Sequence, residues 1–238
     1  MAGETTKTEA ICLDIRPWSR TSHVVRWMTP DGPVTTVVKG AVRPKSAFLG
    51  QYDLNYTCEI VYYSRAKGEL HALRECSPIS TRENLRSNYR TLVLAEHMRT
   101  QVAALAPHGG ESESWLAALA DALDSLCAAA ADSPRRLVAE LLGFELEILS
   151  LSGLSPEIEA ESGSFSLRGE RQMPISQEVA RCIDDPKAEK NMQILLDAAR
   201  AIGVFYAFHL DSAPEARRTV LRMISNNEEG TGTQNGKD

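Results

Sequence analysis

The hydrophobic period of this chain changes once, near residue 80, and this change constrains the fold more than any other feature. Before it, short segments alternate apolar and polar residues and are rich in β-branched and aromatic side chains, as β-strands are. After it, apolar residues recur at steps of three and four, as in amphipathic helices. The sequence therefore predicts an α+β multidomain protein in which an all-β domain precedes an all-α domain.

Turn signals divide the first part into five short strands. One of them is Pro30-Asp31-Gly32, in which proline presets φ and glycine accepts a positive φ. Five strands within about 70 residues fit the five-stranded OB-fold barrel best among small barrels. We expect this domain to cover residues 1–80, with strands at 8–15, 22–28, 34–38, 53–63 and 69–76.

The second part is predicted to be a helical domain over residues 81–225. An irregular polar insert at about 155–176 interrupts it, with short strand-like runs at 165–167 and 172–175. Residues 226–238, which lack apolar anchors, are expected to form a disordered tail. The predicted helices cover 84–106, 115–130, 133–152, 176–183, 186–210 and 214–224.

Charge is distributed unevenly along a chain whose formal net charge is −6. Residues 1–80 carry 10 Lys and Arg against 8 Asp and Glu, whereas residues 81–238 carry 16 against 24. Within 16–45 a single acid, Asp31, faces six cations, and such a local excess suggests a polyanionic partner. The six cations are Arg16, Arg20, Arg26, Lys39, Arg43 and Lys45.

Three of these cations lie in the segment that follows the third predicted strand. There Lys39, Arg43 and Lys45 can neutralise phosphates, Gly40 allows close backbone approach, and Ser46 adds a hydrogen-bonding group. From these residues alone, a phosphate-binding loop and a solvated hairpin loop are equally good interpretations.

OB-folds also bind single strands by stacking bases on aromatic side chains. Seven of the 14 aromatic residues lie in the first third of the chain, and most of these are expected in the barrel core. Trp18, which lies between Arg16 and Arg20 in a predicted loop, is the best candidate for stacking.

No motif of an enzyme or of a metal site is present. The chain lacks a nucleophile elbow, a P-loop, a dinucleotide fingerprint and an H-E-x-x-H helix, and its five histidines are not at ligand spacing. Its five cysteines are dispersed, as in a cytoplasmic protein with reduced thiols. We therefore expect no catalysis, no metal and no cofactor. Uncharged apolar runs stay well below the roughly 18 residues of a membrane helix, so no membrane partner is expected.

Several segments resemble the RecO family of bacterial recombination mediators. Residues 39–46, Lys-Gly-Ala-Val-Arg-Pro-Lys-Ser, are similar to the K-G-A-R-R-P-K-S stretch of that family. Looser similarity extends to residues 9–13, 23–25, 68–75 and 144–157. The resemblance implies an OB-fold and a helical domain, with no catalytic residues.

The same resemblance implies a role in DNA repair and homologous recombination in the bacterial cytoplasm, at the nucleoid. Family members bind single- and double-stranded DNA, anneal complementary strands, and help load a recombinase onto strands coated by single-strand-binding protein. Their partners are RecR and the acidic, hydrophobic C-terminal tail of single-strand-binding protein. We expect that tail to bind the helical domain, beside one of Arg82, Arg86, Arg90, Arg99, Arg135 and Arg136.

The sequence departs from the family pattern in two places. Many members carry four zinc-binding cysteines where residues 157–176 of this chain have none, so we predict that the zinc site is absent. Val42 also stands where the family often has a cation.

Two other functions remain open from the sequence. One is a non-catalytic adaptor whose OB-fold binds DNA weakly. The other is a nucleic-acid hydrolase, which would need clustered carboxylates or histidines that the sequence does not bring together. DNA strand preference and oligomeric state do not follow from the sequence.

Overall fold

The structure, a computed structural model, describes residues 4–64, 70–109, 112–129, 133–161, 164–167, 173–209, 217–219 and 221–222. The predicted tail at 226–238 lies outside these residues. Contacts divide the chain into two compact units. The first comprises Met1–Glu83 with Arg99–Asp124, and the second comprises Asn84–Met98 with Ser125–Asp238. This division does not test the predicted domains at 1–80 and 81–225, which stay a prediction.

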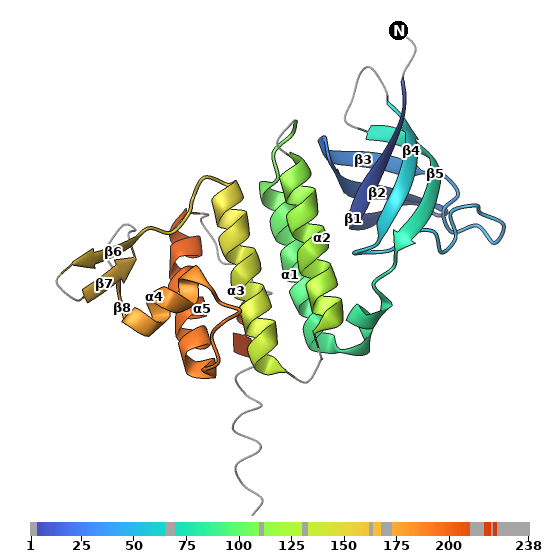
Figure 1. Ribbon diagram of the computed structural model, residues 1–238. Coiled ribbons are helices and arrows are strands. Elements are labelled where there is room, and N and C mark those ends of the chain that lie inside the picture. Colours follow the sequence, from blue (N-terminus) through green and yellow to red (C-terminus); the bar gives the residue numbers. More distant parts are fainter. Residues whose placement is uncertain are drawn as a thin grey trace, which may run out of the picture. The chain divides into compact units, whose positions relative to one another are not determined.

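The first unit contains the predicted five-stranded barrel, which is confirmed (Figure 1). Its strand order is β1-β2-β3-β5-β4, and β4 pairs back onto β1 to close it. All neighbouring strands are antiparallel except β3 and β5. The strands are β1 (Thr5–Ser19), β2 (Ser22–Thr29), β3 (Gly32–Val38), β4 (Thr57–Tyr63) and β5 (Leu70–Ser80).

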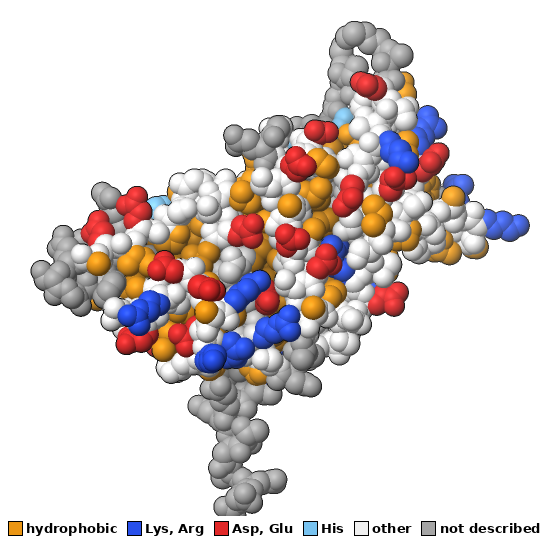
Figure 2. Space-filling view, in the orientation of Figure 1, with side chains coloured by type: hydrophobic (Ala, Val, Ile, Leu, Met, Phe, Trp, Pro, Cys, Tyr) orange, Lys and Arg blue, Asp and Glu red, His pale blue; other side chains and the backbone are white. Residues whose placement is uncertain are grey.

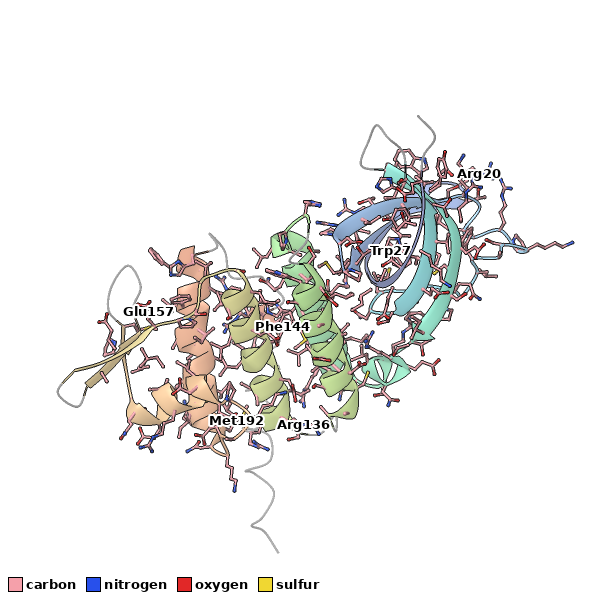
Figure 3. All side chains as sticks on the ribbon, turned by 45° about the horizontal axis from the view of Figure 1, so that its top comes forward. Arg20, Trp27, Arg136, Phe144, Glu157 and Met192 are labelled. Carbon is pink, nitrogen blue, oxygen red and sulfur yellow. The ribbon has the colours of Figure 1, made fainter. Side chains whose placement is uncertain are left out.

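Alternation along the strands fills the barrel interior. Figure 3 shows Trp27 within the barrel, where it is fully buried and its Nε1–H donates to Thr36 Oγ1 at 2.9 Å. Burial raises the pKa of the Cys12 thiol well above its ordinary value, so this side chain remains a protonated thiol. The core cluster consists of Ala10, Cys12, Val25, Trp27, Val38, Ala41, Cys58, Ile60, Leu73 and Cys76.

The structure differs from the prediction at several strand boundaries. β1 extends over Thr5–Ser19 instead of 8–15, so Trp18 belongs to this strand and not to the predicted loop. β3 begins at Gly32 instead of residue 34. β4 begins at Thr57 instead of residue 53, because Tyr56 N–H donates to Asp53 O at 3.1 Å and Asn55 adopts a φ of 67°, which together form a turn. β5 continues past Pro78, because that proline is next to a register shift in the ladder, where a missing N–H is tolerated.

Residues of 99–124 complete the first unit around the barrel. Arg82, whose side chain is 3% exposed, donates to Thr57 Oγ1 at 2.7 Å and forms an ion pair with Asp124 at 2.6 Å. Arg99 donates to the carbonyl of Leu13.

A close backbone approach fixes the loop after residue 106 against the β2–β3 turn. Gly109 N–H donates to Asp31 O at 3.2 Å, and Gly32 has a φ of 117°. A Cβ on Gly32 would lie 3.1 Å from Gly109 N, so this position requires glycine.

The second unit is mainly helical, as predicted, but the insert at 155–176 is not wholly irregular. It contains an antiparallel three-stranded sheet of β6 (Ile158–Glu161), β7 (Ser164–Leu167) and β8 (Met173–Ile175). The helical elements of the described chain are η1 (Glu83–Ser87), α1 (Tyr89–Leu105), α2 (Ser112–Ala128), α3 (Pro134–Leu151), α4 (Gln177–Asp184) and α5 (Met192–His209). None of the helices searched is long and apolar enough to cross a membrane, within the described residues.

The last of these helices begins later than predicted, at Met192 and not at Pro186. Asp185 Oδ1 accepts from the N–H groups of Lys187 and Ala188, which holds a turn after α4. Asn191 then accepts from Gln193 N–H at 2.9 Å and starts the new helix.

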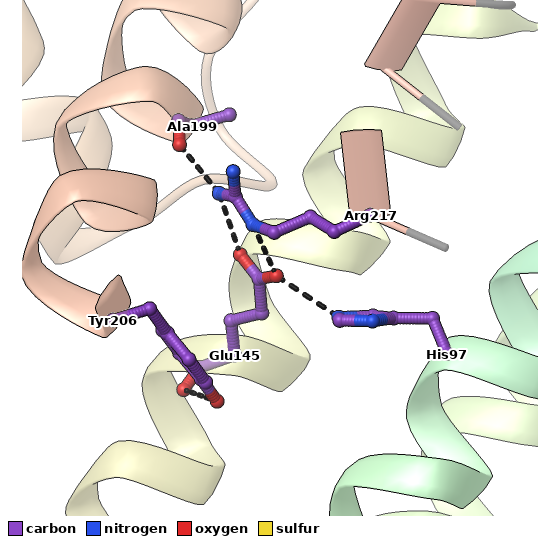
Figure 4. Close-up of polar contacts among 5 residues, drawn as sticks. All are labelled: His97, Glu145, Ala199, Tyr206 and Arg217. Atoms are coloured by element: carbon purple, nitrogen blue, oxygen red, sulfur yellow. Dashed lines mark hydrogen bonds and ion pairs between the residues drawn. The ribbon is translucent and has the colours of Figure 1, made fainter. Parts of the chain in front are cut away.

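A buried ionic cluster joins the helices of the second unit (Figure 4). Glu145, fully buried in α3, accepts from Arg217 at 2.6 and 3.0 Å and from His97 Nε2 at 3.0 Å. Arg217 also donates to Ala199 O at 2.5 Å. Burial alone would raise the pKa of Glu145, but the Arg217 guanidinium and the His97 hydrogen bond lower it below its ordinary value. Glu145 is therefore held as a carboxylate.

Candidate nucleic-acid interface

Strand register places two rows of side chains on the outer face of the barrel. Asp14, Arg26 and Thr35 are paired across β1, β2 and β3, and Arg16 pairs with Val24 one row further on. Alternate residues of a strand share a face, so the two rows form one surface. This surface holds a groove of about 500 Å³, lined by Asp14, Arg16, Val24, Arg26, Pro33, Val34, Thr35, His71 and His108.

The groove is cationic. Within the described part of the chain, Arg26 has neither an ion pair nor a side-chain hydrogen bond. Arg16, with 79% of its side chain exposed, lies 2.5 Å from Asp14 Oδ2. Two guanidinium groups thus face one carboxylate, which leaves a positive charge that suits a phosphate chain.

A basic tip lies at the end of the barrel where β1 turns into β2. We define the tip as Trp18–Thr21 together with the loop Lys39–Leu49. Two hydrogen bonds join its parts: Val42 N–H donates to Thr21 O at 3.3 Å, and Gly40 N–H donates to Ser22 Oγ at 3.2 Å. The fold therefore brings Arg20 to the loop that the sequence analysis selected, and Figure 3 shows Arg20 at the periphery of the barrel.

Gly40 shapes the loop of the tip. It has a φ of 67°, and its carbonyl accepts from Arg43 N–H at 3.1 Å, which makes the tight turn. Ser46 Oγ accepts from Phe48 N–H at 3.2 Å. Both predicted residues thus have a structural role in holding the loop, besides any contact with a ligand.

The cations of the tip project into solvent, and Figure 2 shows Lys and Arg side chains extending from this loop. Among the described residues, no hydrogen bond or ion pair engages their side chains. They are Arg20, Lys39, Arg43 and Lys45.

The aromatic residues considered for base stacking differ in their exposure to solvent. Trp18 is 62% exposed, whereas Trp27 belongs to the core. Tyr52 accepts or donates a 2.8 Å hydrogen bond with His23, and Tyr62 packs against the ring of His71. Trp18 is therefore the aromatic side chain of the described barrel that is most available for stacking.

Among the groove residues that the sequence analysis missed, three have ionisable side chains: Asp14, His71 and His108. Asp14 could have been found, because strand alternation puts it on the face of Arg16. His71 comes from β5, which reaches β3 through a parallel pairing, and His108 comes from the loop held at Gly32. No local pattern signals these two.

A second hollow, of about 580 Å³, belongs to the second unit. Its lining includes the apolar side chains of Leu146, Pro156, Ile158 and Ile183. It also includes one cation, the exposed Arg181, and one carboxylate, the exposed Asp184. Of the six arginines suggested for the partner tail, Arg82 and Arg99 are buried in internal contacts. In the described ranges, no group of three or more His, Cys, Asp or Glu side chains is placed to hold a metal ion.

Residues 1–82 match a family model described as the N-terminal domain of recombination protein O. A search of curated proteins gave no match. The matched segment contains all strands of the barrel, the groove side chains of β1 to β3, and the whole tip.

Proposed function

The chain belongs to the RecO family through the N-terminal domain formed by residues 1–82, and we propose that it serves DNA repair and recombination as a non-catalytic mediator. In this role it binds and anneals DNA and helps load a recombinase onto single strands coated by single-strand-binding protein. Its partners are then DNA, a RecR-like protein and the tail of single-strand-binding protein, at the bacterial nucleoid.

The observation that carries this proposal is the set of barrel cations whose side chains have no partner among the described residues, Arg20, Arg26, Lys39, Arg43 and Lys45, in a chain of net charge −6. Attraction to DNA cannot come from the charge of such a chain as a whole and requires a local patch. OB-folds bind oligonucleotides on the face of strands 2 and 3 and at the loop between strands 1 and 2. The groove includes residues of β2 and β3, and the tip includes the turn between β1 and β2.

Annealing by such a surface needs neutralised charge and positioned strands, not acid–base chemistry. Arg16 and Arg26 of the groove and the cations of the tip bind phosphates, and Trp18 stacks on a base. The second hollow, with apolar walls and Arg181, suits the acidic, hydrophobic tail of single-strand-binding protein.

The decisive experiment replaces Lys39, Arg43 and Lys45 together with alanine. Binding to single-stranded DNA is measured by fluorescence anisotropy across a salt titration. Each phosphate contact contributes about −0.7 to the log–log salt slope, so the slope should flatten by about 2 units. Affinity should fall for all sequences alike.

The matched control replaces three exposed cations of the second unit, Lys187, Lys190 and Arg200, with alanine. It changes the net charge equally and should leave the slope unchanged. If the loop variant stayed folded and kept the affinity and slope of the wild type, the adaptor function would be favoured instead.

A further inference from the structure

The basic tip combines exposed apolar side chains with cations that have no side-chain partner among the described residues. Trp18 is 62% exposed, Val42 48% and Leu49 56%. Val42 and Leu49 belong to the loop that carries Lys39, Arg43 and Lys45, and Val42 is bonded through its backbone to the turn that follows Trp18. Exposed apolar groups that gather in this way mark a surface that binds something.

The position of Trp18 is imposed by the strand ladder. Pro17 pairs with His23 and Ser19 pairs with Ser22, and the register shifts between these pairs, so Trp18 has no cross-strand partner. A β-bulge of this kind re-aims a side chain and is common next to binding sites. His23 is in turn held by Tyr52 at 2.8 Å, which fixes the base of the hairpin.

The ligand must therefore offer an apolar, flat face close to negative charge. Unpaired nucleotides do this, because each base exposes its face and is attached to a phosphate. A continuous duplex presents phosphates but hides the faces of its bases in the stack. The cations of the tip alone do not distinguish the two forms, whereas an exposed indole does.

Resting on the proposed DNA-binding function, we infer that Trp18 lets the tip recognise unpaired bases by stacking, which gives the protein its strand preference. Single strands, overhangs and duplex ends bind the tip through both phosphates and a base. Uninterrupted duplex binds through phosphates alone. Salt-dependent affinity and strand preference then reside in different side chains of the same tip.

The test compares Trp18→Ala with the wild type on three labelled ligands: a single-stranded oligonucleotide, an abasic oligomer of the same length, and a closed circular duplex. Affinity for the oligonucleotide should fall about 5- to 150-fold, the effect of losing one stacked base. Affinity for the abasic oligomer and the circle should stay unchanged, because the phosphate contacts remain. Trp18→Phe should recover part of the loss.

The control variant is Tyr89→Ala, which removes a side chain of α1 that is 63% exposed and lies outside the tip. It should bind all three ligands as the wild type does. Fluorescence gives a second readout, since the other two tryptophans, Trp27 and Trp115, are buried. Quenching by acrylamide should therefore report Trp18, and the single strand should protect it while the abasic oligomer should not.

The outcomes separate this inference from the proposed function. If the wild type bound none of the ligands, the proposed function itself would fail. If it bound DNA but Trp18→Ala bound the oligonucleotide equally well, the inference would be wrong. An equal loss of affinity for the oligonucleotide and the abasic oligomer would also overturn it, because Trp18 would then only support the shape of the tip.

Discussion

At the scale of single residues, Asp14 limits the charge of the groove. Its carboxylate forms an ion pair with Arg16 at 2.5 Å. Asp14 is also the cross-strand partner of Arg26. In Asp14→Asn, Arg16 no longer shares its charge with a carboxylate and neutralises a phosphate more fully. Affinity for single-stranded DNA should rise, and the salt slope should steepen by about 0.7. Anisotropy titrations at several salt concentrations measure both quantities.

A matched control for this change is Glu59→Gln, which also removes a carboxylate from an ion pair, with Lys7 at 2.9 Å, outside the groove lining. It should leave the salt slope as it is. A slope that stays the same in Asp14→Asn would contradict a phosphate-binding role for Arg16.

Sequence reasoning identified the cations of this surface because charge is visible without coordinates. Which of these cations are free to bind a ligand could not be predicted from the sequence. The hydrogen bond between Val42 and Thr21 and the ion pair of Arg16 form only in the folded barrel. His71 and His108 were not predictable, because a parallel strand pairing and a close glycine contact bring them to the groove.

At the scale of elements, Glu145 ties α3 to α1 and to the helical residues 217–219. Glu145→Gln leaves the buried Arg217 guanidinium without its counter-charge. The free energy of unfolding at neutral pH should fall by about 3–5 kcal/mol, as for other broken buried pairs. Urea denaturation followed by circular dichroism measures this loss.

The same pair predicts a pH dependence. The pKa of Glu145 is lowered in the folded state, so its stabilisation is fully present above the ordinary value of 4.5 and is lost as pH falls through the folded-state pKa. The stability difference between the wild type and Glu145→Gln should therefore shrink in acid. Glu147→Gln, at an exposed position of α3, should differ from the wild type at no pH.

The elements themselves were largely predictable from period and turn signals. The errors arose where side chains bond to the local backbone. Bonds to Asp185 and Asn191 hold the residues between α4 and α5, so the helix predicted from residue 186 begins only at Met192. Pro78 ended the predicted fifth strand although a register shift accommodates it. A pattern of apolar positions contains no information on such capping bonds.

At the scale of the whole molecule, we propose that the two partners bind different compact units. We expect Arg181→Glu to weaken binding of a synthetic acidic peptide with an apolar C-terminus by about tenfold, the effect of about 1.4 kcal/mol. Affinity for DNA should not change, because the groove and the tip belong to the other unit. Fluorescence polarisation of the labelled peptide and of DNA checks both statements.

Lys190→Glu makes the same charge change in the second unit, outside the lining of the hollow. It should bind the peptide like the wild type. Equal weakening by Lys190→Glu and Arg181→Glu would mean that the peptide responds to general charge and does not use the hollow.

The order of a barrel followed by helices was predictable because the hydrophobic period changes near residue 80, and the structure confirms it. The grouping of Arg99–Asp124 with the barrel was not predictable. It depends on single long-range contacts, such as that of Arg82 with Asp124, whose two residues are separated by 42 positions.

That contact has a consequence for the order in which the protein is made. β1 cannot complete its pairing until β4 exists, and the barrel cannot close until β5 has left the ribosome. Asp124 is synthesised 42 residues after Arg82, so the Arg82 guanidinium has no Asp124 carboxylate to bind until those residues have been added. The first unit is thus finished late, and we expect a nascent chain shorter than about half the full length to bind DNA less well than the complete protein does.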